Sequence, residues 1–318
     1  MSNTKSTHRT YQPETIGVPP IYVWPPKPVK ALKYLIFDLL YPLGFFLLGL
    51  AWFTWHFLTP SLESMATLEA GWIALLWLRN AALLILVAGS LHWYLHATRS
   101  QQDQYQLNRQ PLGGNGDQFL WGNQVKDNMF WSIASGVSFW TGFEAITYWI
   151  HANDHAPITA SPWYFIFCFY LLFIWSTTNF YWVHRLLHWQ PIYRHAHALH
   201  HRNVDVGPWS GISMHPLEHL LYFSPFILWW WLPVHPVIII LTGLFQGLNP
   251  AFSHCGYDYV KIGKLKLKTG DWFHQLHHQY FNLNYGNIPT PFDKVFNSWH
   301  DGTKTSLEQQ KARMREKR

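Results

Sequence analysis

The chain is 318 residues long and contains 49% hydrophobic, 18% aromatic and only 13% charged residues. A soluble domain carries about 25% charged residues, so this composition excludes an ordinary soluble protein and indicates an integral membrane protein rich in interfacial Trp and Tyr. Two cysteines exclude a disulfide framework, and the net charge of +6 lies mainly beside apolar segments, which disfavours nucleic acid as a partner.

Four apolar segments are long enough to cross a membrane. A spanning helix needs about 20 mostly apolar residues, and residues 1–33, which precede the first candidate, are polar and proline-rich, without the core of a cleavable signal peptide. We expect Arg79, in the second segment, to extend its guanidinium to an interface. Glu144, in the third, is either an interfacial or bundle-facing residue or a functional one. The predicted spans are about 35–58, 72–95, 129–150 and 162–183.

The loop charges predict the orientation of these spans. Lys and Arg are present in residues 1–33, 96–128 and 184–202 but absent from residues 59–71 and 151–161. Because cytoplasmic loops are rich in Lys and Arg, we expect the N-terminus to be cytoplasmic and the first four spans to run in–out–in–out–in.

A fifth apolar stretch, Leu221–Gly247, is interrupted by Pro233 and Pro236. Proline breaks a helix, so we predict a helical hairpin that returns the chain to the cytoplasmic side. The region after it is basic up to the chain end, as cytoplasmic segments are. The predicted fold is therefore an all-α polytopic membrane protein with about four transmembrane helices, a hairpin and a cytoplasmic His-rich metal cap.

Histidines are concentrated in the second half of the chain, where thirteen of the 20 fall between positions 184 and 278. On a helix, imidazoles at i and i+4 share a face and can hold one metal, while a third at i+3 can reach an adjacent metal. A tetrahedral zinc uses four ligands, so clusters of this size fit a dinuclear site better. The clusters are His184 and His188; His197, His200 and His201; and His274, His277 and His278.

The absence of certain residues from the sequence restricts the kinds of metal site that the histidines can form. No glutamate follows His184, which argues against a zinc protease motif, and no Cys-x-x-Cys pair exists. An iron pair can activate O2 for attack on unactivated C–H bonds, and lipid is an abundant substrate of that kind beside a bilayer. Two alternatives stay open: a zinc-dependent membrane hydrolase with Glu218 as base, and a bis-histidine haem protein using His56, His92 and His96.

The boxes His184-Arg-Leu-Leu-His188, His197-Ala-Leu-His200-His201 and His274-Gln-Leu-His277-His278 resemble those of the fatty acid hydroxylase/sterol desaturase superfamily. The resemblance covers about 165–303. It includes the pieces Pro208-Trp-Ser210, His215-Pro-Leu-Glu218, His254-Cys-Gly-Tyr257, Asn284-Tyr-Gly-Asn287 and Phe292-Asp-Lys-Val-Phe296.

The resemblance implies a non-haem di-iron oxygenase that uses two iron ions, O2 and electrons from a separate ferredoxin, cytochrome or reductase. It implies metal ligation by the eight histidines of the boxes and by His254. Asp258 stands where some hydroxylases of the family carry a further histidine, so His215 or Asp258 could complete the ligand set. His215 and His219, which flank Glu218, are either ligands or groups that orient ligands.

The predicted domains are a cytoplasmic segment at 1–33, transmembrane helices and loops at 34–160, a catalytic domain at 161–303 and a basic tail at 304–318. The resemblance favours a sterol-like or isoprenoid lipid over a fatty acyl chain, with hydroxylation and desaturation both open. Lys261, Lys264, Lys266 and Lys268 are candidates for docking an acidic electron carrier.

Overall fold

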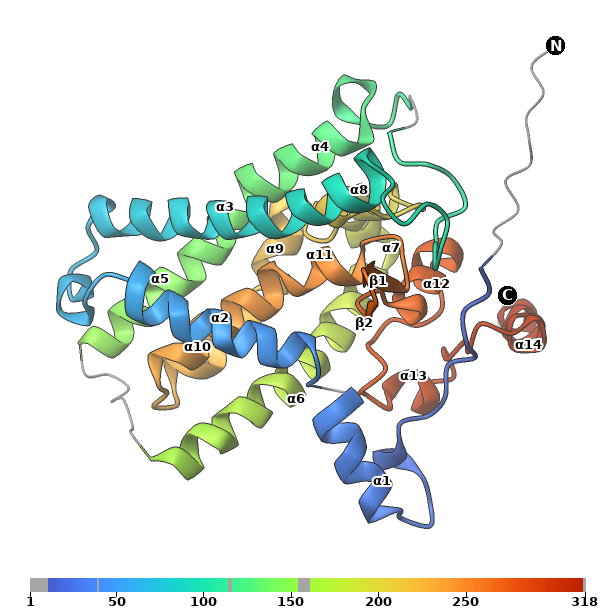
Figure 1. The fold of residues 1–318 in the computed structure, drawn as a ribbon, viewed down its shortest axis with the longest axis horizontal. Helices are drawn as coiled ribbons and strands as arrows, with labels where there is room; N and C mark the ends of the chain where they lie inside the picture. Colours follow the sequence, from blue (N-terminus) through green and yellow to red (C-terminus); the bar gives the residue numbers. More distant parts are fainter. Residues whose placement is uncertain (1–10, 39, 114–115, 154–160, 317–318) are drawn as a thin grey trace.

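Long helices lie side by side and a compact cap gathers at one end of them (Figure 1). The computed structural model describes residues 11–38, 40–113, 116–153 and 161–316. Helix α1 (Pro28–Lys33) projects from the bundle (Figure 1). The helices of the bundle are α2 (Leu43–Leu58), α3 (Ala70–His92), α4 (Gln124–Phe130), α5 (Ser138–Ala152), α6 (Pro162–Leu187), α9 (Pro216–Tyr222), α10 (Pro236–Gly247) and α11 (Asn249–Ser253). The cap contains α7 (Gln190–Ile192), α8 (Ala198–His201), β1 (Tyr259–Ile262), β2 (Leu265–Lys268), α12 (Trp272–Tyr280), α13 (Phe292–Val295) and α14 (Lys304–Glu316).

Short 3-10 and π-helical turns connect or extend these helices. The 3-10 turns are Pro20–Tyr22, Leu62–Met65, Leu120–Gly122, Pro208–Ser210 and Ser224–Trp230. The π-helical turns are Tyr34–Asp38, Trp93–Ala97, Trp131–Val137 and Tyr193–His197.

Three helical stretches in the described residues are long and apolar enough to cross a membrane: Ala70–Ala97, Pro162–Leu187 and Pro236–Ser253. A fourth span results if Pro28–Asp38 and Leu43–Leu58, bent by 50°, are taken as one. The chain is thus a helical membrane protein, as its composition predicts. The predicted span at 129–150 is helical but is not among these stretches. Its helix α5 contacts α3 and α10.

The predicted hairpin is present, with a first limb different from the one expected. Tyr222 and Gln246 exchange hydrogen bonds, and Trp229 Nε1 donates to Thr242 Oγ1, so the chain before the prolines runs antiparallel to α10. Its first limb consists of α9 and a 3-10 helix, not one α-helix. At the turn, His235 accepts a hydrogen bond from the Val237 N–H and caps α10.

Glycines allow α5 and α10 to approach closely. A Cβ at Gly243 would lie 2.2 Å from Trp140 Nε1, and one at Gly247 would lie 2.5 Å from the same ring. Small residues let membrane helices pack backbone to side chain, so Trp140 fills the core between these helices.

Arg79 does not extend to an interface as expected. Its guanidinium donates to Glu144 Oε1 at 2.5 Å, and both side chains are buried. Asn80 Nδ2 donates to Glu144 Oε2 at 3.0 Å. Burying a charge is costly unless it is paired, and the pairing of α3 with α5 supplies the partner.

Two short strands add to the predicted all-α fold. Strands β1 and β2 pair antiparallel, with Lys261 opposite Lys266. Gly263, at φ 59°, provides the left-handed turn residue between them. The lysine-rich segment is therefore an exposed β-hairpin on the cap.

Candidate metal centre

Four chain segments bring the predicted histidines together at the cap end of the bundle (Figure 1). His184 lies in the last turn of α6 and His188 caps that helix. A π-helical turn and α8 carry the second box, and α12 carries the third after its N-cap Asp271 accepts a hydrogen bond from the His274 N–H at 3.0 Å. His254 follows α11 directly.

The nine predicted histidines divide into two groups, and in each the candidate ligand atoms lie within 4.8 Å of one another. The i, i+4 pair of the second box is in one group and its i+3 member is in the other, as the helical spacing predicts. The third box is divided in the same way. The first group is His184, His188, His197, His201 and His277; the second is His200, His254, His274 and His278.

Within each group, three Nε2 atoms contact one another mutually. In the first group, His188, His201 and His277 have Nε2–Nε2 distances of 3.0–3.1 Å. In the second, the distances among His254, His274 and His278 are 3.2–3.3 Å. A ring nitrogen carries either a proton or a lone pair, so at least one contact in each triangle joins two like groups.

A bound cation would resolve this conflict. Nitrogen ligands lie about 2.0–2.1 Å from a bound zinc, and tetrahedral or octahedral geometry then separates them by roughly 3 Å. The two nitrogen triangles therefore have the size of a metal's coordination shell. Nε2 of His184 and of His197 are also buried without a hydrogen-bond partner, which fits two further ligand atoms.

Hydrogen bonds at the other ring nitrogen fix several of these imidazoles. Nδ1 of His184 lies 2.6 Å from the Tyr285 carbonyl, and Nδ1 of His277 lies 2.6 Å from the Leu283 carbonyl. Nδ1 of His254 lies 3.0 Å from the Pro250 carbonyl. A carbonyl only accepts, so each Nδ1 donates its proton and Nε2 keeps a lone pair for metal.

Two carboxylates support this arrangement. His197 Nδ1 donates to Glu218 Oε1 at 2.8 Å. Asp293 accepts from the Tyr285 and Gly286 N–H groups at 2.9 and 2.7 Å and so holds the loop whose carbonyl orients His184. The sequence singled out Glu218 but gave Asp293 no role. The backbone carbonyls that accept hydrogen bonds from the histidines could not have been predicted from the sequence, because every residue type has a carbonyl.

Burial keeps the imidazoles in the form that binds metal. It lowers the pKa of His188 to about 3 and that of His200 to about 4. Both are therefore neutral near pH 7, with a lone pair available.

The remaining candidate ligands lie outside both groups. His215 is the N-cap of α9 and accepts from the Leu217 N–H. His219 uses both ring nitrogens, toward Ser135 and the Ile212 carbonyl. Asp258 is bound by Lys268 Nζ at 2.6 Å and the Tyr11 hydroxyl at 2.7 Å. Neither histidine group therefore includes His215, His219 or Asp258.

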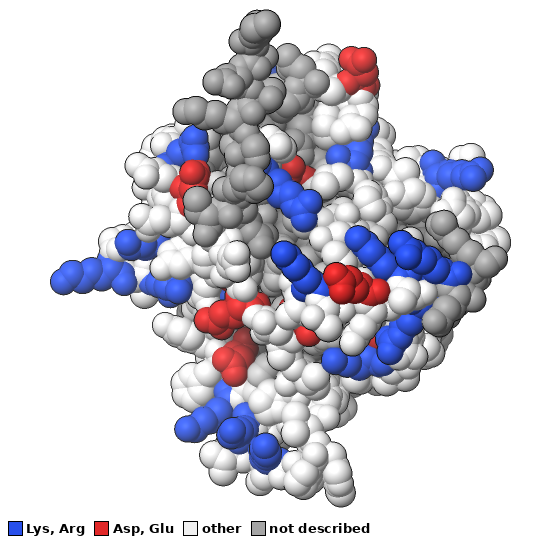
Figure 2. Space-filling view, turned by 90° about the vertical axis from the view of Figure 1, so that its right-hand side faces the viewer, with Lys and Arg blue, Asp and Glu red and all other residues white. Residues whose placement is uncertain are grey.

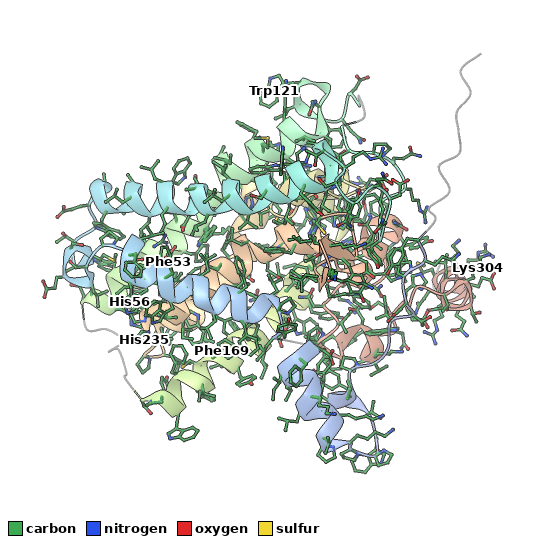
Figure 3. All side chains as sticks on the ribbon, in the orientation of Figure 1. Phe53, His56, Trp121, Phe169, His235 and Lys304 are labelled. Atoms are coloured by element: carbon green, nitrogen blue, oxygen red, sulfur yellow. The ribbon has the colours of Figure 1, made fainter. Side chains whose placement is uncertain are left out.

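The haem alternative is contradicted by the positions of its histidines. The rings of His92 and His96 are 5.6 Å apart on one face of a helix, and His96 Nε2 contacts the Cys255 carbonyl. His56 lies near His235 at the opposite end of the bundle (Figure 3). These three histidines cannot ligate one haem.

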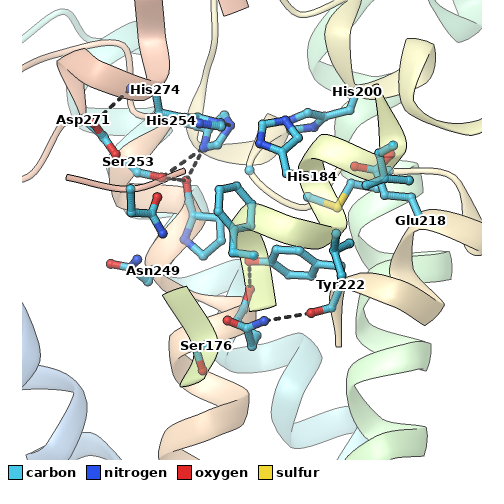
Figure 4. Close-up of a pocket in the computed structure, with 18 of the residues that line it drawn as sticks. Ser176, His184, His200, Glu218, Tyr222, Asn249, Ser253, His254, Asp271 and His274 are labelled. Carbon is cyan, nitrogen blue, oxygen red and sulfur yellow. Dashed lines mark hydrogen bonds between the residues drawn. The ribbon is translucent and has the colours of Figure 1, made fainter. Parts of the chain in front are cut away.

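A cavity lies against the metal centre (Figure 4). Histidines of both groups contribute to it, among them His184, His200 and His274. Apolar side chains, including Phe180, Met214, Tyr222 and Phe245, make up much of the remaining wall. The cavity, of about 70 Å³, therefore places an apolar wall directly beside both histidine groups.

The segment that contains the histidine groups resembles known proteins. Residues 169–298 match the fatty acid hydroxylase family and contain all nine clustered histidines. This segment is therefore similar to the fatty acid hydroxylase/sterol desaturase superfamily. The matched segment contains the three boxes, His254 and the Asp293 loop.

The similar curated proteins are sterol-modifying enzymes by name. The chain is 29% identical over 127 residues to the Delta(7)-sterol 5(6)-desaturase of Candida dubliniensis, covering 40% of this chain and 32% of that protein. It is 31% identical to the desaturase erg31 of Schizosaccharomyces pombe, covering 43% and 45%. It is 32% identical to a provisionally named methylsterol monooxygenase of Dictyostelium discoideum, covering 46% and 55%.

The match to this superfamily is partial along the chain. The matched segments span about a third to just over half of these relatives. No solved structure matches the chain significantly. The N-terminal helices therefore lie outside the matched family segment.

Proposed function

We propose that this protein is a membrane-bound non-haem di-iron oxygenase that uses O2 to hydroxylate or desaturate a sterol-like or isoprenoid lipid. The observation that carries the proposal is the pair of adjacent all-imidazole groups beside an apolar cavity. Two bound iron ions would supply the activation of O2 and the oxidising power for an unactivated C–H bond. The names of the sterol-modifying relatives support the substrate class and an oxidoreductase activity.

Residues around the histidine groups orient the proposed ligands and exclude water from the cavity. The His197–Glu218 and His184–Tyr285 hydrogen bonds orient ligands of the first group. The His254–Pro250 hydrogen bond orients a ligand of the second group. The apolar wall excludes water from the reacting carbon, which protects a reactive oxidant from side reactions.

Replacing His277 with alanine tests the ligand assignment. The variant should lose bound iron and lipid oxidation together, because the Nε2 triangle of the first group loses one corner. His195→Ala is the matched control, since His195 is an exposed residue outside both groups. Measurement of iron per chain and of product in the same preparations decides the matter, and retention of both by His277→Ala would contradict the assignment.

Metal analysis and lipid analysis separate the proposal from its alternative. About two irons per chain and O2 consumption support the oxygenase, whereas one zinc without O2 consumption supports a zinc-dependent hydrolase based on Glu218. Comparison of host lipids with and without the gene should reveal species that differ by one oxygen or two hydrogens. Their absence from a strain producing iron-loaded protein would contradict the proposed reaction.

A separate electron carrier is part of the proposal, because oxidation of a lipid C–H bond with O2 at an iron pair needs electrons from an external donor. Basic side chains are prominent on the cap end (Figure 2), and Lys261, Lys264 and Lys266 are exposed on the β-hairpin. An acidic ferredoxin, cytochrome or reductase fits this surface, which we place in the cytoplasm with both termini.

Charge reversal on the hairpin tests the docking site. Lys264→Glu should slow carrier-dependent turnover and weaken its salt dependence, while Lys304→Glu on α14 serves as a control on the same end of the molecule. Rates with a small chemical reductant should not change. If Lys264→Glu and wild type had equal carrier-dependent rates and equal salt dependence of those rates, the hairpin would not be part of the docking site.

A further inference from the structure

A second, larger cavity of about 560 Å³ adjoins the metal pocket. Its volume is within the range of about 300–1,000 Å³ that is usual for sites of small molecules. The two cavities share five lining residues, so the larger cavity lies directly beside the pocket that the histidines line. The shared residues are Phe245, Asn249, Ser253, Asp271 and Asn287.

The walls of this larger cavity come from two distant parts of the chain. The π-helical turn Tyr34–Asp38 and the start of α2 form one wall, with Tyr34, Phe37, Leu43 and Leu47. Helix α6 contributes Phe173 and Thr177. The first wall lies outside residues 169–298, the segment shared with the superfamily.

The packing of three helices explains why space remains between these walls. Helices α2 and α6 both pack on α10. Phe245 of α10 and Asn249 of α11 line the cavity together with residues of α2 and α6. The cavity is therefore bounded by two membrane helices that share a third helix as their neighbour.

The lining of the cavity combines exposed aromatic side chains with charged groups, Asp38 among them. Phe37 is 60% exposed and Tyr41 57% exposed although both line the cavity, so it opens beside them. On the cap side, the lining includes Glu14 and the Asp258–Lys268 ion pair. Such a cavity matches an amphipathic lipid with an apolar body and a polar group.

The inner pocket offers one further polar contact. Ser176 is 1% exposed, and its Oγ has no hydrogen-bond partner. It lines the pocket on α6, two helical turns before His184, and lies at the end away from the histidines (Figure 4). A buried hydroxyl without a partner is unfavourable, and a polar atom of a bound ligand would satisfy it.

We infer that the larger cavity is the entry chamber for a sterol-like lipid, which passes from the bilayer between α2 and α6 to the metal pocket. We further infer that the lining residues within 34–38 and 40–47 help to select that lipid. This inference rests on the proposed lipid oxidation, which it extends by naming a route and a selecting wall. The chamber is defined by the residues lining the larger cavity.

Narrowing the chamber tests its role in turnover. Leu43→Trp places a bulky ring at the chamber wall, and kcat/KM for the lipid should fall at least about tenfold while iron per chain stays at two. Leu58→Trp is the matched control, because Leu58 is an exposed residue at the other end of α2. Phe37→Ala is a second variant that removes exposed chamber wall without disturbing the core, and it should raise KM.

Photolabelling tests occupancy without requiring turnover. A diazirine-bearing sterol with an alkyne handle is added to iron-loaded protein in lipid nanodiscs, and the labelled peptides are identified by mass spectrometry. Label should appear in residues 34–47 and 173–177, and Leu43→Trp but not Leu58→Trp should reduce it. Label found only in other residues, together with wild-type labelling and kcat/KM in Leu43→Trp, would contradict the proposal that this cavity is the entry chamber.

The two experiments separate this inference from the proposed function. Chamber labelling without any oxidised lipid would support the chamber and contradict the proposed oxygenase. Oxidised lipid with turnover unaffected by Leu43→Trp and Phe37→Ala would support the oxygenase and overturn the chamber.

Discussion

At the scale of single residues, Glu218 shows how a buried side chain can act on a metal without binding it. Its Oε1 accepts the Nδ1 proton of His197, while Oε2 has no hydrogen-bond partner in the structure. This bond fixes the tautomer and orientation of the imidazole and makes Nε2 a stronger ligand. We therefore propose that Glu218 is a positioning residue for the first histidine group.

We expect Glu218→Ala to lower iron affinity about 10–100-fold, the usual effect of losing a hydrogen-bond partner of a ligand. Glu218→Gln should recover part of that affinity, because its amide oxygen can still accept from His197. Competition with a chelator of known affinity measures both variants. Wild-type iron affinity in Glu218→Ala would show that the hydrogen bond does not position the ligand.

At the scale of helices, the Arg79–Glu144 pair connects α3 to α5. Both side chains are buried, and Thr59 and Asn80 contribute further hydrogen bonds to Arg79. Removing one partner leaves an uncompensated charge in a low-dielectric interior, whereas removing both leaves none. The pair therefore favours one arrangement of α3 against α5.

Glu144→Leu alone should destabilise the protein by about 3–5 kcal/mol, because Arg79 would remain buried without its ion-pair partner. The double variant Arg79→Met with Glu144→Leu should recover most of that loss. Unfolding in mixed micelles gives both free energies. If the double variant were as unstable as the sum of the single variants, the pairing would not be the source of the stability.

At the scale of the whole molecule, the metal centre connects segments that are far apart in sequence. The histidine groups contain residues from the end of α6, the second box, the position after α11 (His254) and α12. In addition, Asn284 links the chain after α12 to the C-terminal segment, accepting from the His300 N–H at 2.7 Å. Bound metal should therefore stabilise the cap as a unit.

Removing the metal with a chelator should lower the midpoint of thermal unfolding in detergent, and adding Fe(II) back should restore it. Ligand binding to the folded state adds about 2.7 kcal/mol when free metal is one hundredfold above its Kd. The His277→Ala variant should respond much less to the chelator. An unchanged midpoint in metal-free wild type would show that the cap does not depend on its metals.

The sequence by itself determined the features that depend on neighbouring residues. Apolar length predicted the membrane helices, Pro233 and Pro236 predicted the reversal before α10, and helical spacing predicted that His200 and His201 serve different groups. These follow from local periodicity and backbone restriction, which act over a few residues.

Only the tertiary structure decided which distant groups meet. Glu144 lies 65 positions from Arg79, and the Tyr285 carbonyl lies 101 positions from His184. The carboxylate of Asp258 could bind a metal, but in the structure it accepts hydrogen bonds from Lys268 and Tyr11. The chamber joins residues 34–47 to α6 and the cap. Such pairings depend on how whole helices pack, and no local pattern in the sequence encodes that packing.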